Sequence, residues 1–291
     1  MTDASQNLLS ILEIEPLELD LYRGRTPSTS SQRVFGGQVI AQALVAAQRT
    51  VEGERYVHSL HGYFMLGGDP SIPILYQVGR LRDGGSFTTR RVTAIQHGRA
   101  IFSLEASFQV DEEGLDYQAP MPPNVPMPEE LLSQREIAER HGDRLPAGLL
   151  RVWARERPIE LRPTNLDHFL SNEKLPPQQW NWLRFRDPVP DDRRVQAALL
   201  AYLSDFTLLD TATLAHGRNI FEPEIQVASL DHAMWFHRSH SLDGWLLYSQ
   251  DSPSTSGSRG FTRGALYGRD GTLIASVAQE GLIRLRTKQT R

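Results

Sequence analysis

The sequence predicts an α+β protein built from two tandem repeats, each with one long helix followed by an antiparallel sheet. Three observations support this fold class. A helical segment precedes a series of strand-like runs in each half, a proline-rich stretch separates the halves, and short matches between the halves recur at nearly the same offset. The length of 291 residues suits two domains of about 120 to 150 residues each.

Composition and charge exclude several kinds of protein. Apolar residues make up 40% of the chain and charged residues 23%, as in ordinary globular proteins. The formal net charge of −4 gives no general field that would attract nucleic acid or an anionic membrane. The chain has no cysteine, which rules out disulfides, thiolate metal sites and a cysteine nucleophile. The start of the chain lacks a secretory signal and no stretch approaches ~20 consecutive apolar residues, so we expect a cytoplasmic protein with no membrane partner.

The first half begins with short elements and then a buried helix. Residues 7–15 have helical spacing, and residues 17–22 fit an edge strand. The double glycine Gly36-Gly37 then precedes an alanine-rich apolar segment, which predicts a tightly packed helix. The free N–H groups at the start of this helix are suited to face an oxygen of a ligand.

Four strand-like runs follow this helix and predict an antiparallel meander. They are residues 57–64, 74–82, 86–96 and 100–110. The breaks between them carry good turn residues, namely Gly67-Gly68-Asp69-Pro70, Asp83-Gly84-Gly85 and His97-Gly98.

A proline-rich segment at residues 118–164 interrupts this pattern. It contains eight prolines and one charged helical piece near residues 129–140. Because proline removes backbone donors, the segment makes a poor sheet, and we predict a linker here. The predicted domains are therefore residues 1–117 and 165–291.

The second half repeats the order of the first. Residues 194–209 are predicted to form a helix, and strand-like runs follow at residues 225–238, 245–251, 259–268 and 273–284. Val57-His58-Ser59-Leu60 resembles Val227-Ala228-Ser229-Leu230 at an offset of 170, and residues 100–107 resemble residues 272–279 at an offset of 172. An internal duplication explains both offsets.

Residues 225–238 place polar side chains inside an apolar run. Ser229, Asp231, His232 and His237 interrupt what is otherwise a pattern typical of a buried strand. A buried polar atom needs a hydrogen-bond partner or costs a few kcal/mol. These side chains are therefore either paired for structural reasons or used in chemistry.

Several motifs together resemble one enzyme family along almost the whole chain. They are Val34-Phe35-Gly36-Gly37-Gln38-Val39, Leu81-Arg82-Asp83-Gly84, Arg90-Arg91-Val92, Met234-Trp235-Phe236-His237-Arg238 and Gln279-Glu280-Gly281. The chain resembles the acyl-CoA thioesterase II family in these residues. The resemblance implies a double hotdog fold and hydrolysis of fatty acyl-CoA to free acid and CoA. It also implies that no metal, no cofactor and no covalent intermediate takes part.

The resemblance implies that Asp205, Ser229 and Gln279 are the catalytic residues, since they match the family's Asp, Thr or Ser, and Gln. The residue types suit the reaction, because a carboxylate can take a proton from water while a hydroxyl and an amide orient that water. Each residue also has an ordinary alternative. Asp205 could be a solvated or capping residue, Ser229 a satisfied strand hydroxyl, and Gln279 a cross-strand amide.

The N-terminal half offers candidate substrate contacts rather than catalysts. Gly36 and Gly37 are candidates for stabilising the oxyanion through backbone N–H groups. His58 and Arg91 are further candidate substrate contacts, with packing and solvation as the alternatives. The candidate partners for the CoA phosphates are Arg33, Arg82, Arg90, Arg91 and Arg263.

The duplication predicts one active site per chain, in the C-terminal half. The counterpart of Gln279 in the first half is Ser107, and the counterpart of Asp205 lies near Phe35. Where the family often has Leu-Arg-Pro-Gly-Asp, this chain has Met65-Leu66-Gly67-Gly68-Asp69, so any contact of that arginine is missing.

Other functions remain open from the sequence. A nucleophilic Ser229 with His232 or His237 would make a serine hydrolase, but neither the strand alternation nor a Gly-x-Ser-x-Gly turn supports it. A hydratase or dehydratase would need a histidine on the helix, whereas His216 follows the predicted helix. A non-catalytic acyl-CoA sensor is the third possibility. Because hotdog sheets commonly pair, we expect a homodimer or homotetramer.

Overall fold

The chain folds into two compact units, each with its own antiparallel sheet. The computed structural model describes residues 3–27, 33–155 and 157–286. Unit 1 comprises Met1–Gln118, Val189–Phe206 and Asp231–Ser241. Unit 2 comprises Ala119–Pro188, Thr207–Leu230 and Leu242–Arg291. Each unit groups residues that contact one another in space. The domains predicted at residues 1–117 and 165–291 are instead the two copies of a sequence repeat, so their limits remain a prediction.

The sheet of unit 1 has the strand order β1-β2-β4-β5-β6-β3-β10, with antiparallel neighbours. Its strands are β1 (Glu15–Glu18), β2 (Leu21–Gly24), β3 (Arg55–Phe64), β4 (Ile74–Asp83), β5 (Phe87–Gln96), β6 (Arg99–Val110) and β10 (Asp231–Phe236). In the middle of the sheet Val92 pairs with Leu104, and Leu60 pairs with Ala106. All four side chains are buried, so the register places the apolar face of each strand toward the core.

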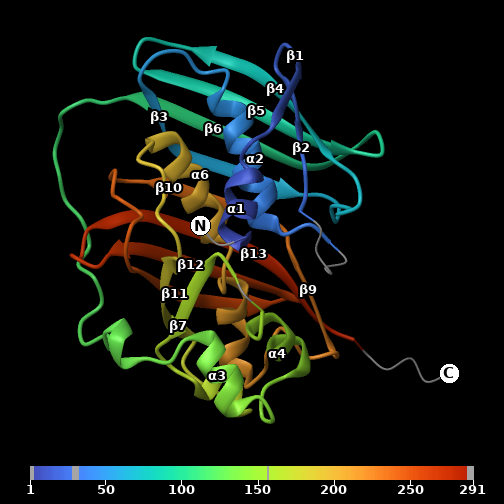
Figure 1. The fold of residues 1–291 in the computed structure, drawn as a ribbon, viewed down its shortest axis with the longest axis vertical. Helices are drawn as coiled ribbons and strands as arrows, with labels where there is room; N and C mark the ends of the chain where they lie inside the picture. The colour runs from blue at the N-terminus through green and yellow to red at the C-terminus, as the bar shows by residue number, and fades with distance from the viewer. Residues whose placement is uncertain (1–2, 28–32, 156, 287–291) are drawn as a thin grey trace. The chain divides into compact units, whose positions relative to one another are not determined.

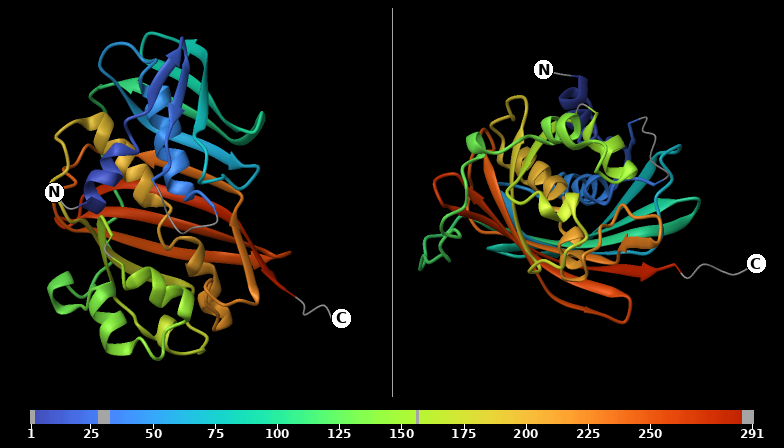
Figure 2. Two further views of the ribbon diagram at one scale, coloured as in Figure 1. Left: turned by 45° about the vertical axis from the view of Figure 1, so that its right-hand side comes forward. Right: turned by 90° about the horizontal axis from the view of Figure 1, so that it is seen from below.

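Helix α2 (Gly36–Gln48) forms the centre of unit 1, and strands β3 to β6 curve around it (Figure 1). Val39, Ile40 and Leu44 are buried against the sheet, and the intervening alanines let neighbouring elements approach closely. Helix α6 (Arg193–Ser204) lies beside α2 and runs antiparallel to it (Figure 2). The Gln48 Nε2 donates to the Arg194 carbonyl at 3.1 Å, which fixes one end of this helix pair. The short helix α1 (Asp3–Ser10) precedes β1.

The sheet of unit 2 has the order β13-β12-β11-β8-β7, and β9 also pairs with β13. Its strands are β7 (Ile159–Pro163), β8 (Gln178–Phe185), β9 (Ile225–Ser229), β11 (Leu246–Ser256), β12 (Arg259–Gly268) and β13 (Leu273–Leu285). The 3₁₀ helix η2 (Leu209–His216) packs on this sheet against β8, β11, β12 and β13. Unit 2 therefore repeats the helix-on-sheet arrangement of unit 1.

The second predicted helix is confirmed at its start but ends five residues earlier than predicted. Residues 194–209 do not form one helix, because α6 ends at Ser204 and packs on α2 within unit 1. Thr207 then has a φ of 57°, a left-handed conformation that no helix continues through. The predicted residues beyond Ser204 instead lead through this turn into the 3₁₀ helix η2.

The strand predicted at residues 225–238 is broken into β9 and β10. The break lies at Leu230, whose N–H donates to the Glu280 carbonyl at 2.9 Å. β9 pairs with β13, whereas β10 pairs with β3, so a single alternation of faces does not run from Ser229 to His237. The strands predicted in the two meanders are otherwise confirmed, with limits shifted by at most five residues. The single edge strand predicted at residues 17–22 is wrong, because a turn there separates β1 from β2.

The proline-rich segment contains more structure than predicted. It forms η1 (Pro128–Glu130), α3 (Gln134–His141), α4 (Ala147–Trp153) and the strand β7, with α5 (Asp167–Leu170) following. Helix α3 begins with a capping box in which Ser133 and Glu136 bond each other's backbone N–H groups. β7 is a terminal strand of its sheet and ends at Pro163, a position where a missing donor is tolerated.

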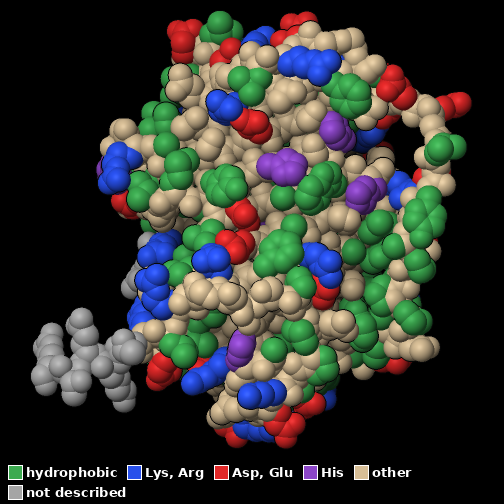
Figure 3. Space-filling view, turned by 180° about the vertical axis from the view of Figure 1, so that it is seen from behind, with side chains coloured by type: hydrophobic (Ala, Val, Ile, Leu, Met, Phe, Trp, Pro, Cys, Tyr) green, Lys and Arg blue, Asp and Glu red, His purple; other side chains and the backbone are tan. Residues whose placement is uncertain are grey.

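One long apolar segment bears on the expectation that the chain has no membrane span. The stretch Arg193–His216, which contains α6 and η2, is long and apolar enough to cross a membrane, but 72% of its most apolar window is buried inside the protein. Such burial is typical of core helices. On the face drawn in Figure 3, acidic and basic side chains are interspersed.

Candidate active site

The carboxylate of Asp205 lies at the N-terminus of α2. Asp205 directly follows α6, and its Oδ2 accepts a hydrogen bond from the Gly37 N–H at 2.9 Å. The N-cap residue of α2, Phe35, makes no side-chain capping bond, so Asp205 supplies the cap from 168 residues away. The positive end of the helix dipole is complementary to a carboxylate at this position.

Gly36 and Gly37 permit this contact because they have no side chains. A Cβ on Gly36 would lie 2.7 Å from Asp205 Oδ2, and a Cβ on Gly37 would lie 2.3 Å from the Tyr202 carbonyl oxygen. The double glycine therefore lets α2 approach the end of α6. The Gly37 N–H that was predicted to stabilise an oxyanion is bonded to Asp205 instead, so the oxyanion role competes with this bond.

Aromatic rings surround the same contact. Phe35 packs edge-on against Tyr202, with ring centroids 5.1 Å apart, and against Phe206 at 5.3 Å. Edge-to-face pairs of this kind hold side chains in defined positions. The phenylalanine before the double glycine thus fixes the residues on both sides of Asp205.

Ser229 and Gln279 form a second pair, within unit 2. The Gln279 Nε2 donates to the Ser229 Oγ at 2.8 Å. Gln279 is only 1% exposed and lies on β13, while Ser229 is the last residue of β9 and is partly exposed. Because Ser229 Oγ accepts this bond, its own O–H proton remains available to donate to another group.

The predicted catalytic residues are therefore brought together as two pairs, Asp205 with Gly37 and Ser229 with Gln279. The action of both pairs on one water stays a prediction. The sequence did not indicate that a glycine N–H holds the carboxylate. The only signal that pointed there was the double glycine at the start of a helix.

The start of η2 is held by a buried polar network. Gln250 Oε1 accepts from Thr207 Oγ1 at 2.9 Å, and Gln179 Nε2 donates to Thr211 Oγ1 at 2.6 Å and to the Thr207 carbonyl at 3.0 Å. These bonds maintain the left-handed conformation of Thr207, which is unfavourable for a β-branched residue. The network lies two residues after Asp205 in the chain and was not foreseen from the sequence.

The surroundings of the two histidines in residues 225–238 suit a structural role. His232 is 1% exposed, and its Nε2 lies 2.8 Å from the Ser204 Oγ. Burial lowers the pKa of His237, and the adjacent Arg238 lowers it further. Ser229 Oγ is bonded to an amide rather than to an imidazole, so the geometry gives no support to a nucleophilic serine.

The candidate substrate contacts of unit 1 have partners within the protein. His58 Nε2 lies 2.8 Å from Ser107 Oγ, and burial lowers the pKa of His58. Arg91 forms an exposed ion pair with Glu105. Their predicted contact with substrate remains a prediction.

Two of the other candidate phosphate partners are also engaged. Arg90 is buried and bonded to Thr50 and Asp83, while Arg263 forms an ion pair with Asp251.

A buried histidine–carboxylate pair was missed by the sequence analysis. His168 Nε2 lies 2.7 Å from Asp210 Oδ2, and both side chains are less than 5% exposed. The pair joins α5 to η2 inside unit 2. Within residues 3–27, 33–155 and 157–286, no cluster of three His, Asp or Glu side chains is arranged to hold a metal ion.

Comparison with family models covers most of the chain. Residues 25–109 match the model described as acyl-CoA thioesterase N-terminal domain, and residues 151–282 match the model described as acyl-CoA thioesterase. Acyl-coenzyme A thioesterase 8 of Mus musculus is 44% identical in an alignment of 288 residues that covers 95% of this chain and 88% of the relative.

Solved structures show the same likeness. The acyl-CoA thioesterase II TesB2 from Mycobacterium marinum is 43% identical, with a TM-score of 0.78 over 96% of this chain and 98% of its own. A protein of unknown function with a hotdog fold from Alicyclobacillus acidocaldarius is 17% identical, with a TM-score of 0.76 over 99% and 100% of the two chains. The double hotdog fold predicted from the sequence is confirmed.

Proposed function

Because the chain belongs to the acyl-CoA thioesterase family, we propose that it hydrolyses fatty acyl-CoA to fatty acid and CoA by attack of a water that Asp205 activates. The observation that carries the mechanism is the bond from the Gly37 N–H to Asp205 Oδ2 at 2.9 Å. This bond occupies one oxygen of the carboxylate and holds the side chain, so that the other oxygen is oriented to act as the base.

Hydrogen-bond capacity assigns a role to each residue around the water. The water donates one hydrogen to Asp205 and the other to Gln279 Oε1, and it accepts the O–H of Ser229. One lone pair then remains and is aimed at the thioester carbon. This assignment agrees with the Gln279 Nε2 donating to Ser229 Oγ, which leaves the serine proton for the water.

The proposed steps balance without a further reactant. The water oxygen bonds to the carbonyl carbon as Asp205 takes a proton, and the resulting tetrahedral species collapses with cleavage of the C–S bond. The proton held by Asp205 then passes to the CoA thiolate. The tetrahedral species carries its negative charge on the former carbonyl oxygen, and backbone N–H groups are suited to stabilise this oxyanion.

Release of free CoA from palmitoyl-CoA, followed with a thiol reagent, tests this function. We expect wild-type turnover and a loss of about 100-fold or more in kcat for Asp205→Asn, since a general base contributes roughly 10²–10⁴. Asp143→Asn, which changes an exposed aspartate, is the matched control and should keep full activity. Absence of CoA release by the wild type across acyl chain lengths would refute the thioesterase function. Product analysis with an unsaturated acyl-CoA distinguishes a hydratase.

We also propose that the enzyme acts as a homodimer or homotetramer in the cytoplasm. The support is the composition of the chain and the habit of hotdog sheets to pair. Light scattering of the purified protein tests the oligomeric state, and a monomer at micromolar concentration would contradict it.

A further inference from the structure

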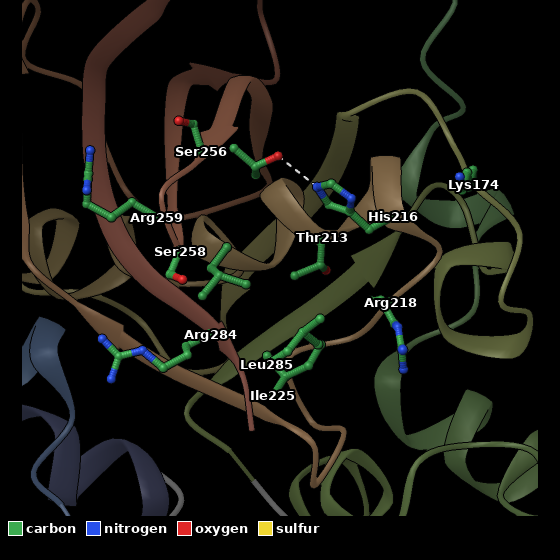
Figure 4. Close-up of a pocket in the computed structure, with 12 residues that line it drawn as sticks. Lys174, Thr213, His216, Arg218, Ile225, Ser256, Ser258, Arg259, Arg284 and Leu285 are labelled. Carbon is green, nitrogen blue, oxygen red and sulfur yellow. Dashed lines mark hydrogen bonds between the residues drawn. The ribbon is translucent and has the colours of Figure 1, made fainter. Parts of the chain in front are cut away.

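Unit 2 contains a pocket of about 530 Å³ that none of the roles above uses. It lies among the C-terminal end of η2, the turn between β11 and β12, and the ends of β9 and β13 (Figure 4). Ile225 and Ile283 line its apolar part, and Thr213, Ser256 and Ser258 contribute hydroxyl groups. The pocket therefore combines an apolar surface with several hydrogen-bond donors.

Four cationic side chains line this pocket, although the whole chain has a net charge of −4. Arg259 and Arg284 lie on one side in Figure 4, and Lys174 and Arg218 lie on the other. None of the lining residues, all of which belong to the described chain, is an aspartate or a glutamate. A concave site lined by one sign of charge attracts ligands of the opposite sign.

Within the described chain, two of these four side chains form an ion pair with a carboxylate, and two do not. Arg218 pairs with Glu222 at 2.6 Å, and Arg259 pairs with Glu280 at 2.9 Å. Lys174 and Arg284 form no ion pair with any residue that the structure describes. The pocket thus keeps positive charge that a bound anion can neutralise.

The apolar wall of the pocket lies on the same face of the sheet as Ser229 and Gln279, whereas Arg259 and Arg284 extend from the opposite face around the strand ends. Side chains alternate along a strand, so Gln279 and Ile283 of β13 share a face, as do Ile225 and Ser229 of β9. Each pair is separated by four residues, or about 13 Å at ~3.3 Å per residue. The extended phosphopantetheine arm of CoA is long enough to span this distance.

Helix η2 lies over the sheet between the two regions. A Cβ on Gly281, which lies between Gln279 and Ile283, would be 2.5 Å from Leu209 Cδ1. Thr213 and His216, at the other end of η2, line the pocket, and His216 Nε2 lies 2.7 Å from Thr255 Oγ1. A ligand that links the two regions must therefore pass along the flank of η2.

We propose that this pocket binds the 3′-phosphorylated ADP portion of the acyl-CoA substrate. Guanidinium and ammonium groups bind the diphosphate and the 3′-phosphate, and the apolar part receives the adenine. The inference rests on the proposed function for the identity of the ligand. The cations and the apolar wall would also suit a free nucleotide, so the test must distinguish a substrate subsite from a separate nucleotide site.

Charge reversal at the two unpaired cations tests the proposal. In Arg284→Glu and in Lys174→Glu, we expect KM for palmitoyl-CoA to rise about tenfold with kcat unchanged, since each variant loses a charge-assisted hydrogen bond to a phosphate. Palmitoyl-pantetheine carries the same thioester without phosphates, and its KM should not change. Arg151→Glu alters an exposed arginine of α4 outside the pocket and is the matched control.

A second measurement separates this proposal from the proposed function. Adenosine 3′,5′-bisphosphate should bind the wild type in calorimetry and should inhibit it competitively against palmitoyl-CoA, and both variants should bind it about tenfold more weakly. Binding without any turnover would refute the thioesterase function but not the pocket. An unchanged KM in both variants, an equal rise with palmitoyl-pantetheine, or noncompetitive inhibition would overturn the assignment of the pocket to CoA.

Discussion

Replacing Gly36 by alanine tests the position of Asp205 without removing its carboxylate. The new Cβ would lie 2.7 Å from Asp205 Oδ2 and 3.1 Å from Phe64 Cζ. An ordinary contact needs at least 3.4 Å, so the carboxylate must move by about 0.7 Å. This movement also stretches the 2.9 Å bond from the Gly37 N–H, a charge-assisted bond worth ~1.5–3 kcal/mol.

The expected result for Gly36→Ala is a loss of about 10- to 100-fold in kcat with little change in KM. A displacement of ~1 Å in a catalytic group can cost about 10² in rate. Stability should change little, because alanine favours a helix over glycine by up to ~1 kcal/mol and this gain opposes the crowding. Initial rates of CoA release and the thermal midpoint should be measured together.

Gly85→Ala is the matched control, since a Cβ there meets nothing within 4 Å. It should leave kcat unchanged. If Gly36→Ala keeps the wild-type kcat while remaining folded, then the contact between α2 and Asp205 does not position the base.

Two further predictions concern stability and its dependence on pH. Glu160 is 4% exposed and is bonded to Arg162 and Arg184. Burial alone would raise the pKa of Glu160, but the bonds to the two arginines outweigh burial, so the pKa is lowered. Glu160→Gln should lower the urea-derived free energy of unfolding at pH 7 by about 2–3 kcal/mol, less than for a fully buried pair because Arg184 is 41% exposed. The deficit should vanish as the pH falls through the lowered pKa, and a deficit that persists in acid would contradict the charge-based explanation. Burial lowers the pKa of His58, so its unfolded form binds a proton more readily, and the associated stability is present above about pH 6.5 and lost as the pH falls below it. Relative to His58→Gln, the wild type should lose stability between about pH 7.5 and 5.5, whereas a constant difference would show that His58 does not titrate differently on folding.

Most strands could be predicted from the sequence, because alternation of apolar and polar residues depends only on neighbours in the chain. The run at residues 225–238 shows the limit of this approach. Its break at Leu230 depends on a bond to the Glu280 carbonyl, fifty residues away. No local pattern encodes that partner, so the sequence suggested one strand where the protein has β9 and β10.

The second helix was predicted five residues too long for a similar reason. Apolar spacing at residues 194–209 is genuinely helical up to Ser204, but the left-handed Thr207 is held by Gln179 and Gln250 from distant strands. Periodicity alone continues the helix to residue 209, whereas these tertiary contacts end it at Ser204.

The sequence identified the residues of the candidate site but not the hydrogen bonds that they form. The motif pattern pointed to Asp205, Ser229 and Gln279, whereas the bond between Gly37 and Asp205 joins positions 168 residues apart. The basic pocket escaped prediction altogether. Its cations come from four separate segments around Lys174, Arg218, Arg259 and Arg284, and each of them alone looks like an ordinary surface residue.

The central claim is that Asp205 and the Ser229–Gln279 pair act on the same water, and a double-mutant cycle tests it most directly. Residues that act as one unit lose their contributions non-additively. The kcat for palmitoyl-CoA should therefore fall almost as far in Asp205→Asn alone as in Asp205→Asn combined with Gln279→Ala. If the losses of the two single variants instead multiply in the double variant, the two pairs contribute independently, and the single activated water is wrong.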